Sequence, residues 1–184
     1  MRNSYIFSTF VVLLILIVLA SNSSSVFATD DFKFMIATAK HDMDIYPNFG
    51  KSPNLLVHFE YGEEIVAFVT ATNTTNKQKT VVYWDYFKPF LPHLEKNGVV
   101  VEYQEAMKNE AGKDPNDDPI RSSASADYLQ PRETKAVGFC DLNEWYGKLE
   151  PGVYELKIFY RSRGNDKPIE SNIIAFEIKA EVIK

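Results

Sequence analysis

Few residues in this chain of 184 have the types and spacing that catalysis needs. The three histidines are His41, His58 and His93, and the segment His41-Asp42-Met43-Asp44 could offer one nitrogen and two oxygens to a metal ion. No HExxH motif or closely paired histidine accompanies them, so we predict no metal site. A metal-dependent hydrolase built on this segment is one of the less favoured alternatives.

Nucleophilic chemistry is no better supplied. Cys140 is the only cysteine, and no serine lies in a Gly-x-Ser-x-Gly elbow. A free thiol is most often a small buried hydrophobe, which we expect of Cys140, although an odd thiol in an exported chain can also form an intermolecular disulfide. The acidic loop at 114–118 lacks the glycine and distal glutamate of an EF-hand, so we interpret it as solvated. The sequence therefore predicts a protein that is not an enzyme and has no cofactor.

Aromatic residues give the strongest binding signal. Successive side chains of a strand alternate between its faces, so the aromatics at 83–90 cannot all enter one core. With Val82 and Trp84 pointing inward, Tyr83 and Phe87 would face the other side. Exposed aromatics anchor protein partners or stack on sugars. We predict a partner-binding surface formed by Tyr83, Tyr86, Phe87, Phe90, Trp145 and Tyr146. The alternative is that a neighbouring loop or strand covers them.

The N-terminus has the pattern of a signal peptide. Arg2 precedes an apolar run from Phe10 to Ala20, and Val26-Phe27-Ala28 forms a plausible cleavage site. Residues 1–28 are therefore predicted to be removed, which makes the mature protein secreted or periplasmic and free of the membrane. An uncleaved anchor is the alternative, although the run is shorter than the roughly 20 residues that span a bilayer.

Composition limits the partners of the mature chain. The net charge is −5, and loss of the leader removes the positive charge of Arg2, so binding to nucleic acid phosphates is not expected. No run of basic residues suits an anionic membrane surface. With 45% hydrophobic residues and 14% aromatics, residues 29–184 can form one domain with a core that needs no disulfide.

Period-two patterns predict about eight short strands, at the spacing of a sandwich or barrel. They cover roughly 32–36, 55–59, 64–72, 80–87, 99–103, 134–139, 154–160 and 172–182. Pro89 and Pro92 predict a break in strand pairing. Gln104–Asp127 is expected to be an irregular insert with at most two helical turns at its start. The absence of αβ alternation argues against a parallel sheet.

A corner motif specifies the type of sandwich. Pro151-Gly152 makes a sharp turn before a strand that starts at Tyr154, whose hydroxyl can bond back across the corner, as in immunoglobulin-like domains. Asp141 is expected to cap a helical turn that Gly147 ends. We predict an all-β, immunoglobulin-like antiparallel β-sandwich without a disulfide, in which Pro151, Gly152 and Tyr154 are structural.

Several turn and strand motifs together resemble a known type of module. They are Gly62-Glu63-Glu64, Asn73-Thr74-Thr75, Leu129-x-Pro131-x-Glu133, Asp141-Leu142, Trp145-Tyr146, Leu149-x-Pro151-Gly152-x-Tyr154, Tyr160-Arg161-Ser162 and Ser171-Asn172. They resemble exported bacterial immunoglobulin-like β-sandwich modules and, more distantly, proteinase inhibitors of the BsuPI type. The chain departs from that pattern at Pro131-Arg132, where Pro-Gly is usual, and in its insert.

These observations predict a non-catalytic secreted module that binds an extracellular or periplasmic protein or another macromolecule. One alternative is a proteinase inhibitor that acts through a projecting loop, either Gln104–Asp127 or Tyr46–Pro53. Another is a carbohydrate-binding module that uses the aromatic residues. Asn73-Thr74-Thr75 is also an N-glycosylation sequon in an expected turn.

Overall fold

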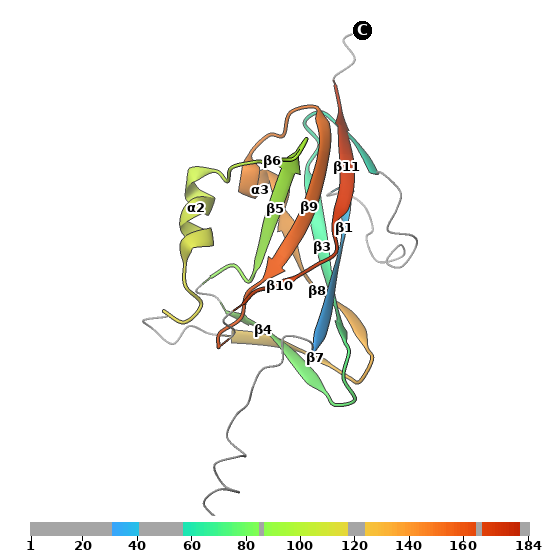
Figure 1. The fold of residues 1–184 in the computed structure, drawn as a ribbon, viewed down its shortest axis with the longest axis vertical. Coiled ribbons are helices and arrows are strands. Elements are labelled where there is room, and N and C mark those ends of the chain that lie inside the picture. The colour runs from blue at the N-terminus through green and yellow to red at the C-terminus, as the bar shows by residue number, and fades with distance from the viewer. Residues whose placement is uncertain (1–30, 41–56, 85–86, 118–123, 165–166, 181–184) are drawn as a thin grey trace, which may run out of the picture.

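Alternating apolar residues produce two packed β-sheets, which confirms the predicted all-β sandwich (Figure 1). The computed structural model describes residues 31–40, 57–84, 87–117, 124–164 and 167–180. The predicted signal peptide lies outside these ranges. In the described part of the chain, no helix is long and apolar enough to cross a bilayer.

The first sheet has three antiparallel strands in the order β1-β3-β8, with bounds Phe32–Lys40, Ile65–Asn73 and Thr134–Asp141. The second has the order β2-β11-β9-β5-β6, with bounds Val57–Glu60, Ile174–Lys179, Gly152–Tyr160, Phe90–Lys96 and Val99–Val100. The two-residue strand β10 (Ile169–Glu170) also pairs with β9. Only the β2–β11 pair is parallel among these described pairings.

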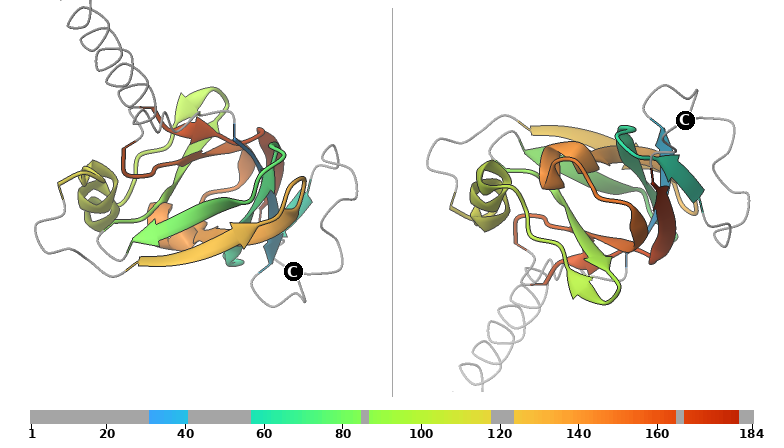
Figure 2. Two further views of the ribbon diagram at one scale, coloured as in Figure 1. Left: turned by 90° about the horizontal axis from the view of Figure 1, so that it is seen from below. Right: turned by 90° about the horizontal axis from the view of Figure 1, so that it is seen from above.

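A third pair, β4 (Lys79–Trp84) with β7 (Ala124–Leu129), continues the β3–β8 pair beyond a sharp bend (Figure 1, Figure 2). Asn73 is fully buried at this bend. Its Nδ2 donates to the carbonyls of Lys77, Leu129 and Gln130 at 2.7–3.1 Å, and its Oδ1 accepts from the backbone and hydroxyl of Thr75. The sequon asparagine is therefore a structural tie whose amide is enclosed by the folded bend.

The inward row of β9 is as predicted. Tyr154, Leu156, Ile158 and Tyr160 are all buried, and the ring of Tyr154 stacks on Phe176 at 5.3 Å. The Tyr154 hydroxyl donates to the carbonyl oxygen of Glu150 at 2.6 Å, four residues back across the Pro151-Gly152 turn. This is the bond expected of a tyrosine corner.

One edge of the sandwich is closed by Ser171 and Asn172. The side chain of Asn172 accepts a hydrogen bond from the backbone N–H of Ile36 in β1 at 2.7 Å. Ser171 Oγ accepts from the backbone N–H of Ile158 in β9 at 2.9 Å. The two side chains thus link β1 of the first sheet to β9 of the second.

Strand β5 corrects the prediction that prolines break pairing here. Pro92 lies inside β5, opposite Ile158 of β9. In an antiparallel strand the N–H and C=O of one residue point to the same side. The Pro92 carbonyl accepts from the hydroxyls of Tyr103 and Tyr146, so the missing N–H faces that side and removes no bond to β9.

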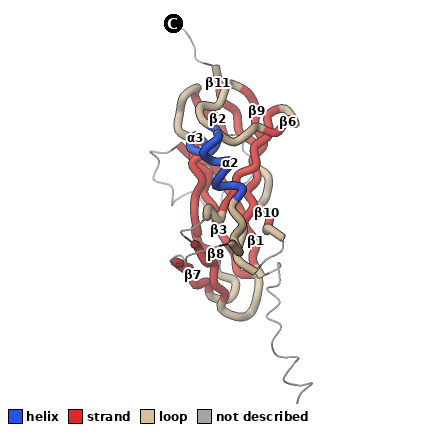
Figure 3. The backbone as a smooth tube through the Cα atoms, turned by 90° about the vertical axis from the view of Figure 1, so that its left-hand side faces the viewer, coloured by secondary structure: helices blue, strands red, loops and turns tan. Residues whose placement is uncertain are grey.

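The described residues of the segment 104–127 confirm the predicted helical turns but not the irregular end. Helix α2 (Glu105–Gly112) is about two turns long, as expected, whereas residues 124–127 belong to β7, whose Ala and Ser residues gave no strand signal. The Arg161 guanidinium donates to the carbonyls of Glu110, Ala111 and Lys113 at the end of α2, and also to that of Lys88. At the other end, Gln104 Nε2 donates to carbonyls of helix α3 (Leu142–Tyr146), so that α2 lies beside α3 on one side of the molecule (Figure 3).

Candidate functional site

The prediction that these aromatic residues form an exposed partner-binding surface is wrong for most of them. Phe87, Phe90, Trp145 and Tyr146 are buried, with exposed fractions of 3%, 5%, 1% and 9%. Tyr103 covers the last two, with ring centroids 5.0 Å from Trp145 and 5.4 Å from Tyr146. The alternative expectation, that neighbouring elements cover these rings, is the one that holds. Tyr86 lies outside the described residues.

The side of strand β4 that faces the core is also the opposite of the predicted one. Val81 is fully buried, whereas Val82 is partly exposed. Tyr83 is partly buried against Phe90, and its hydroxyl donates to Asp127 at 2.8 Å. Burial and this carboxylate raise the pKa of Tyr83 well above its ordinary range. Tyr83 is therefore packed against the edge of the core, and its hydroxyl has a hydrogen-bond partner.

The histidines do not converge in the described part of the chain. His58 of β2 pairs with Glu177 at 2.8 Å, and His93 of β5 pairs with Glu95 at 3.0 Å. Strands β11 and β9 separate β2 from β5, and the two histidines lie in rows four residues apart along β9, which places them about 20 Å apart at normal strand spacing. No three-member cluster of metal-ligating side chains occurs among the described residues. The His41 segment and the Tyr46–Pro53 loop lie outside them.

A bulge in β8 exposes an aromatic residue that the sequence analysis did not select. The register of β8 on β3 shifts between Val69 and Thr70, so Val137 is an extra residue. Val137 and Gly138 therefore both face the core, and the next residue, Phe139, faces outward with 66% of its surface exposed. Gly138 is needed because a Cβ there would lie 2.5 Å from the ring of Phe90.

The outer face of the first sheet is uncharged around Phe139. One cross-strand row is Ala37–Phe68–Phe139, with the two phenyl centroids 6.4 Å apart. The adjacent row runs from Met35 of β1 through β3 to Ala136 of β8. We call this surface the Phe139 face and define it as Met35, Ala37, Phe68, Ala136 and Phe139. Charged residues appear only in the rows beyond it, at Lys33 and Asp141.

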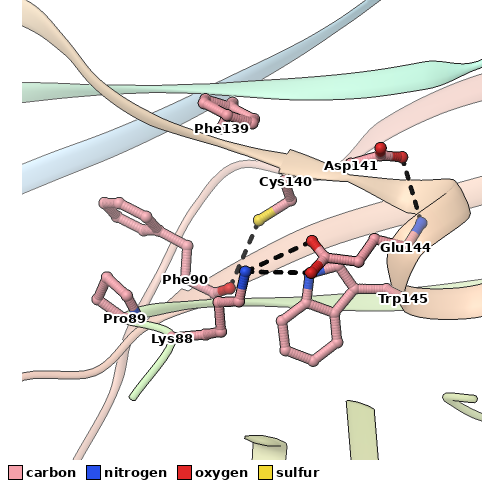
Figure 4. A pocket seen from close by; sticks show the side chains of 8 residues that line it. All are labelled: Lys88, Pro89, Phe90, Phe139, Cys140, Asp141, Glu144 and Trp145. Atoms are coloured by element: carbon pink, nitrogen blue, oxygen red, sulfur yellow. Dashed lines mark hydrogen bonds and ion pairs between the residues drawn. The ribbon is translucent and has the colours of Figure 1, made fainter. Parts of the chain in front are cut away.

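A pocket of about 110 Å³ lies on the opposite side of β8 (Figure 4). The side chain of Cys140 points into it, whereas the ring of Phe139 lies across the strand. Apolar lining comes from Pro89, Phe90 and Trp145, and Phe139 borders the pocket at β8. Asp141 anchors α3 beside the pocket, because its carboxylate accepts from the backbone N–H groups of residues 143 and 144, as the predicted cap requires.

The pocket has a charged mouth and a chemically inert wall. Lys88 and Glu144 are both exposed and form an ion pair at 3.2 Å. Cys140 is buried, as expected, and its thiol donates to the carbonyl of Phe90 at 3.5 Å. Desolvation raises the pKa of this thiol, so it stays protonated at neutral pH and is no nucleophile. The arrangement suits binding of an apolar group rather than reaction with it.

The signal for this site is present in the sequence but indirect. An isolated glycine within a strand pattern indicates a bulge or a close backbone approach, and Gly138 provides both. If Gly138 is interpreted as part of a bulge, the alternation of the strand places Phe139 on the surface instead of in the core. The burial of Trp145 could not be read this way, because it depends on contacts with Tyr103, which is 42 positions away in the chain.

Comparison with known proteins assigns no family. No family model matches the chain, and no curated protein sequence is significantly similar to it. Among solved structures, β-glucosidase from Listeria innocua in complex with glucose is 13% identical with a TM-score of 0.37, and its complex with gluconolactone is 15% identical with a TM-score of 0.36. Each match covers 83% of this chain but only 17% of the enzyme. These scores are too low to transfer a fold family or an activity.

Proposed function

We propose that the chain is a non-catalytic, secreted β-sandwich module that binds a protein through the Phe139 face. The observation that carries this proposal is the exposed ring of Phe139 on an uncharged sheet surface. Aromatic residues are enriched and charged residues depleted at the centres of protein interfaces. Phe139 lies beside the ring of Phe68 but remains 66% exposed, so its side chain contributes little hydrophobic burial to the stability of the fold.

The rigidity of the scaffold supports the same proposal. Phe139 follows the bulge in a strand paired to β3, and two residues later Asp141 forms the N-cap of α3. The ring is thus held on a fixed backbone, so that binding orders little of the protein. The predicted leader at residues 1–28 places this module outside the cytoplasm, where its partner would be an extracellular or periplasmic protein.

The experiment compares partner capture by three forms of residues 29–184. They are the wild type, Phe139→Lys and the control Ile173→Lys. Ile173 is 62% exposed and adjoins β11 of the other sheet, so both variants place the same charge at a similarly exposed apolar site. The proposal predicts a saturable partner that wild type and Ile173→Lys retain and Phe139→Lys loses at unchanged stability. Absence of a saturable partner, or equal retention by Phe139→Lys, contradicts it.

A further inference from the structure

The pocket and the Phe139 face lie on the two sides of one edge strand. Within the described residues β8 pairs with β3 on one side and with no strand on the other, whereas the β1 edge is tied down by Asn172. A partner segment that passes over the free edge of β8 would contact the ring of Phe139 on one side and the mouth of the pocket on the other (Figure 4).

Resting on the proposed function, we infer that this pocket receives one aliphatic side chain of the protein partner. An apolar cavity of about 150 Å³ holds benzene. A pocket of about 110 Å³ walled by Pro89, Phe90 and Trp145 therefore has room for the branched aliphatic group of a leucine or valine.

The charges at the mouth fit the backbone of the inserted residue. Lys88 is a donor and Glu144 an acceptor, and they lie together at the exposed rim. A peptide unit offers one carbonyl acceptor and one N–H donor. The Lys88 ammonium binds the carbonyl on one side of the inserted residue and the Glu144 carboxylate binds its N–H, and such charge-assisted bonds are stronger than neutral ones. The pocket thus selects a peptide-borne aliphatic group over a free hydrocarbon.

The test titrates the folded protein with N-acetyl-leucine methylamide, which carries one aliphatic side chain between two peptide groups. N-acetyl-glycine methylamide is the matched control. Nuclear magnetic resonance follows the Trp145 indole N–H and the Cys140 amide. For a ligand of this size we expect saturable shifts at these groups with a dissociation constant on the order of 1 mM, and none with the glycine compound.

Two variants make the test specific. Cys140→Met fills the pocket from inside and should abolish the shifts. Glu144→Lys lies at the exposed mouth, beside Lys88, so it leaves the core intact and should weaken binding about tenfold by removing the acceptor. No saturable shift with the leucine compound at about 50 mM, which is far above the expected dissociation constant, overturns the inference. Equal binding by wild type and Glu144→Lys also overturns the assigned role of the mouth.

The outcome is separable from the proposed function. If the probe does not bind but Phe139→Lys still loses the partner, the pocket inference fails alone. If the probe binds while Phe139→Lys keeps the partner, the pocket stands and the Phe139 face is not the interface.

Discussion

At the scale of single residues, Asn73 shows how one amide stabilises a bend of four strands. Its side chain makes five hydrogen bonds, three as donor and two as acceptor. Aspartate could not supply the donors, and threonine could not reach three carbonyls. The side chain is fully buried, so water cannot replace these bonds when they are lost.

We therefore expect Asn73→Ala to lower the free energy of unfolding by about 3 kcal/mol or more, since it removes every hydrogen bond of a fully buried amide side chain. Urea denaturation measures the change. Asn76→Ala is the control: Asn76 is exposed and accepts one bond from Arg132 at 3.3 Å, so its loss should stay within about 0.5 kcal/mol. Equal small losses in both variants would show that the bend does not depend on Asn73.

At the scale of elements, two turns share one design. In Glu60–Glu63 and in Gln130–Glu133, the final glutamate accepts from the backbone N–H of the first residue, at 2.7 and 2.6 Å. The third position has positive φ in both, +90° at Gly62 and +64° at Arg132. A turn with proline second and positive φ third favours glycine at that third position. Arg132 therefore adopts a backbone conformation that disfavours its side chain.

Arg132→Gly should raise the free energy of unfolding by about 0.5–1 kcal/mol, because relief of the left-handed conformation exceeds the added freedom of glycine in the unfolded chain. Paired denaturation curves test it. Gly62→Ala, at φ +90°, should shift stability in the opposite direction. A destabilised Arg132→Gly would mean that the exposed bond to Asn76 outweighs the strain.

The bulge of β8 gives a second prediction at this scale. In Gly138→Ala the new methyl group meets the ring of Phe90 at 2.5 Å within the core. We expect a loss of about 1–3 kcal/mol in the free energy of unfolding, as overpacking produces. Gly112→Ala is the matched control, since nothing lies within 4 Å of its added methyl and alanine favours helix α2. A neutral Gly138→Ala would contradict the close approach of β5 to β8.

The contrast between β9 and β5 shows which elements the sequence determines. In β9, local alternation and the Pro151-Gly152 turn agree, so Tyr154 and its row were placed correctly. In β5 the prolines predicted a break in pairing that does not occur. The side of Pro92 that lacks an N–H faces Tyr103 and Tyr146 rather than β9, so no bond to β9 is lost. That partnership joins distant segments and leaves no local pattern. Phe139 was missed for a different reason: the bulge at Val137 reverses its face, and the isolated Gly138 is only an indirect signal of that bulge.

At the scale of the whole molecule, the core contains many ionisable groups kept neutral. Desolvation raises the pKa of Tyr146 and Tyr160 above the ordinary value of 10.0, and that of Cys140 above 9.0. These hydroxyls bond to backbone carbonyls, as Tyr146 does to Pro92 and Tyr160 to Val82. The folded core therefore stabilises the protonated forms of these side chains. No disulfide contributes to its stability.

The sign of the pH dependence follows from this. Above about pH 9 the unfolded chain releases these protons while the folded chain keeps them, so the unfolded state binds fewer protons and stability falls as pH rises. Each group adds a slope of about 1.4 kcal/mol per pH unit between its unfolded and folded pKa. Denaturation from pH 7 to 11, with tyrosinate absorbance, tests this. Tyrosinate that forms fully near pH 10 without loss of structure would contradict it.

The whole-molecule claim is that a disulfide-free sandwich presents Phe139 at its free edge to a protein partner. Affinity for the captured partner, compared between Phe139→Lys and Ile173→Lys, tests it most directly. If Phe139 is a central interface residue, its replacement should weaken binding by about 30-fold or more while Ile173→Lys binds as wild type does. Equal affinity of Phe139→Lys and wild type, with both folded, would place the interface elsewhere.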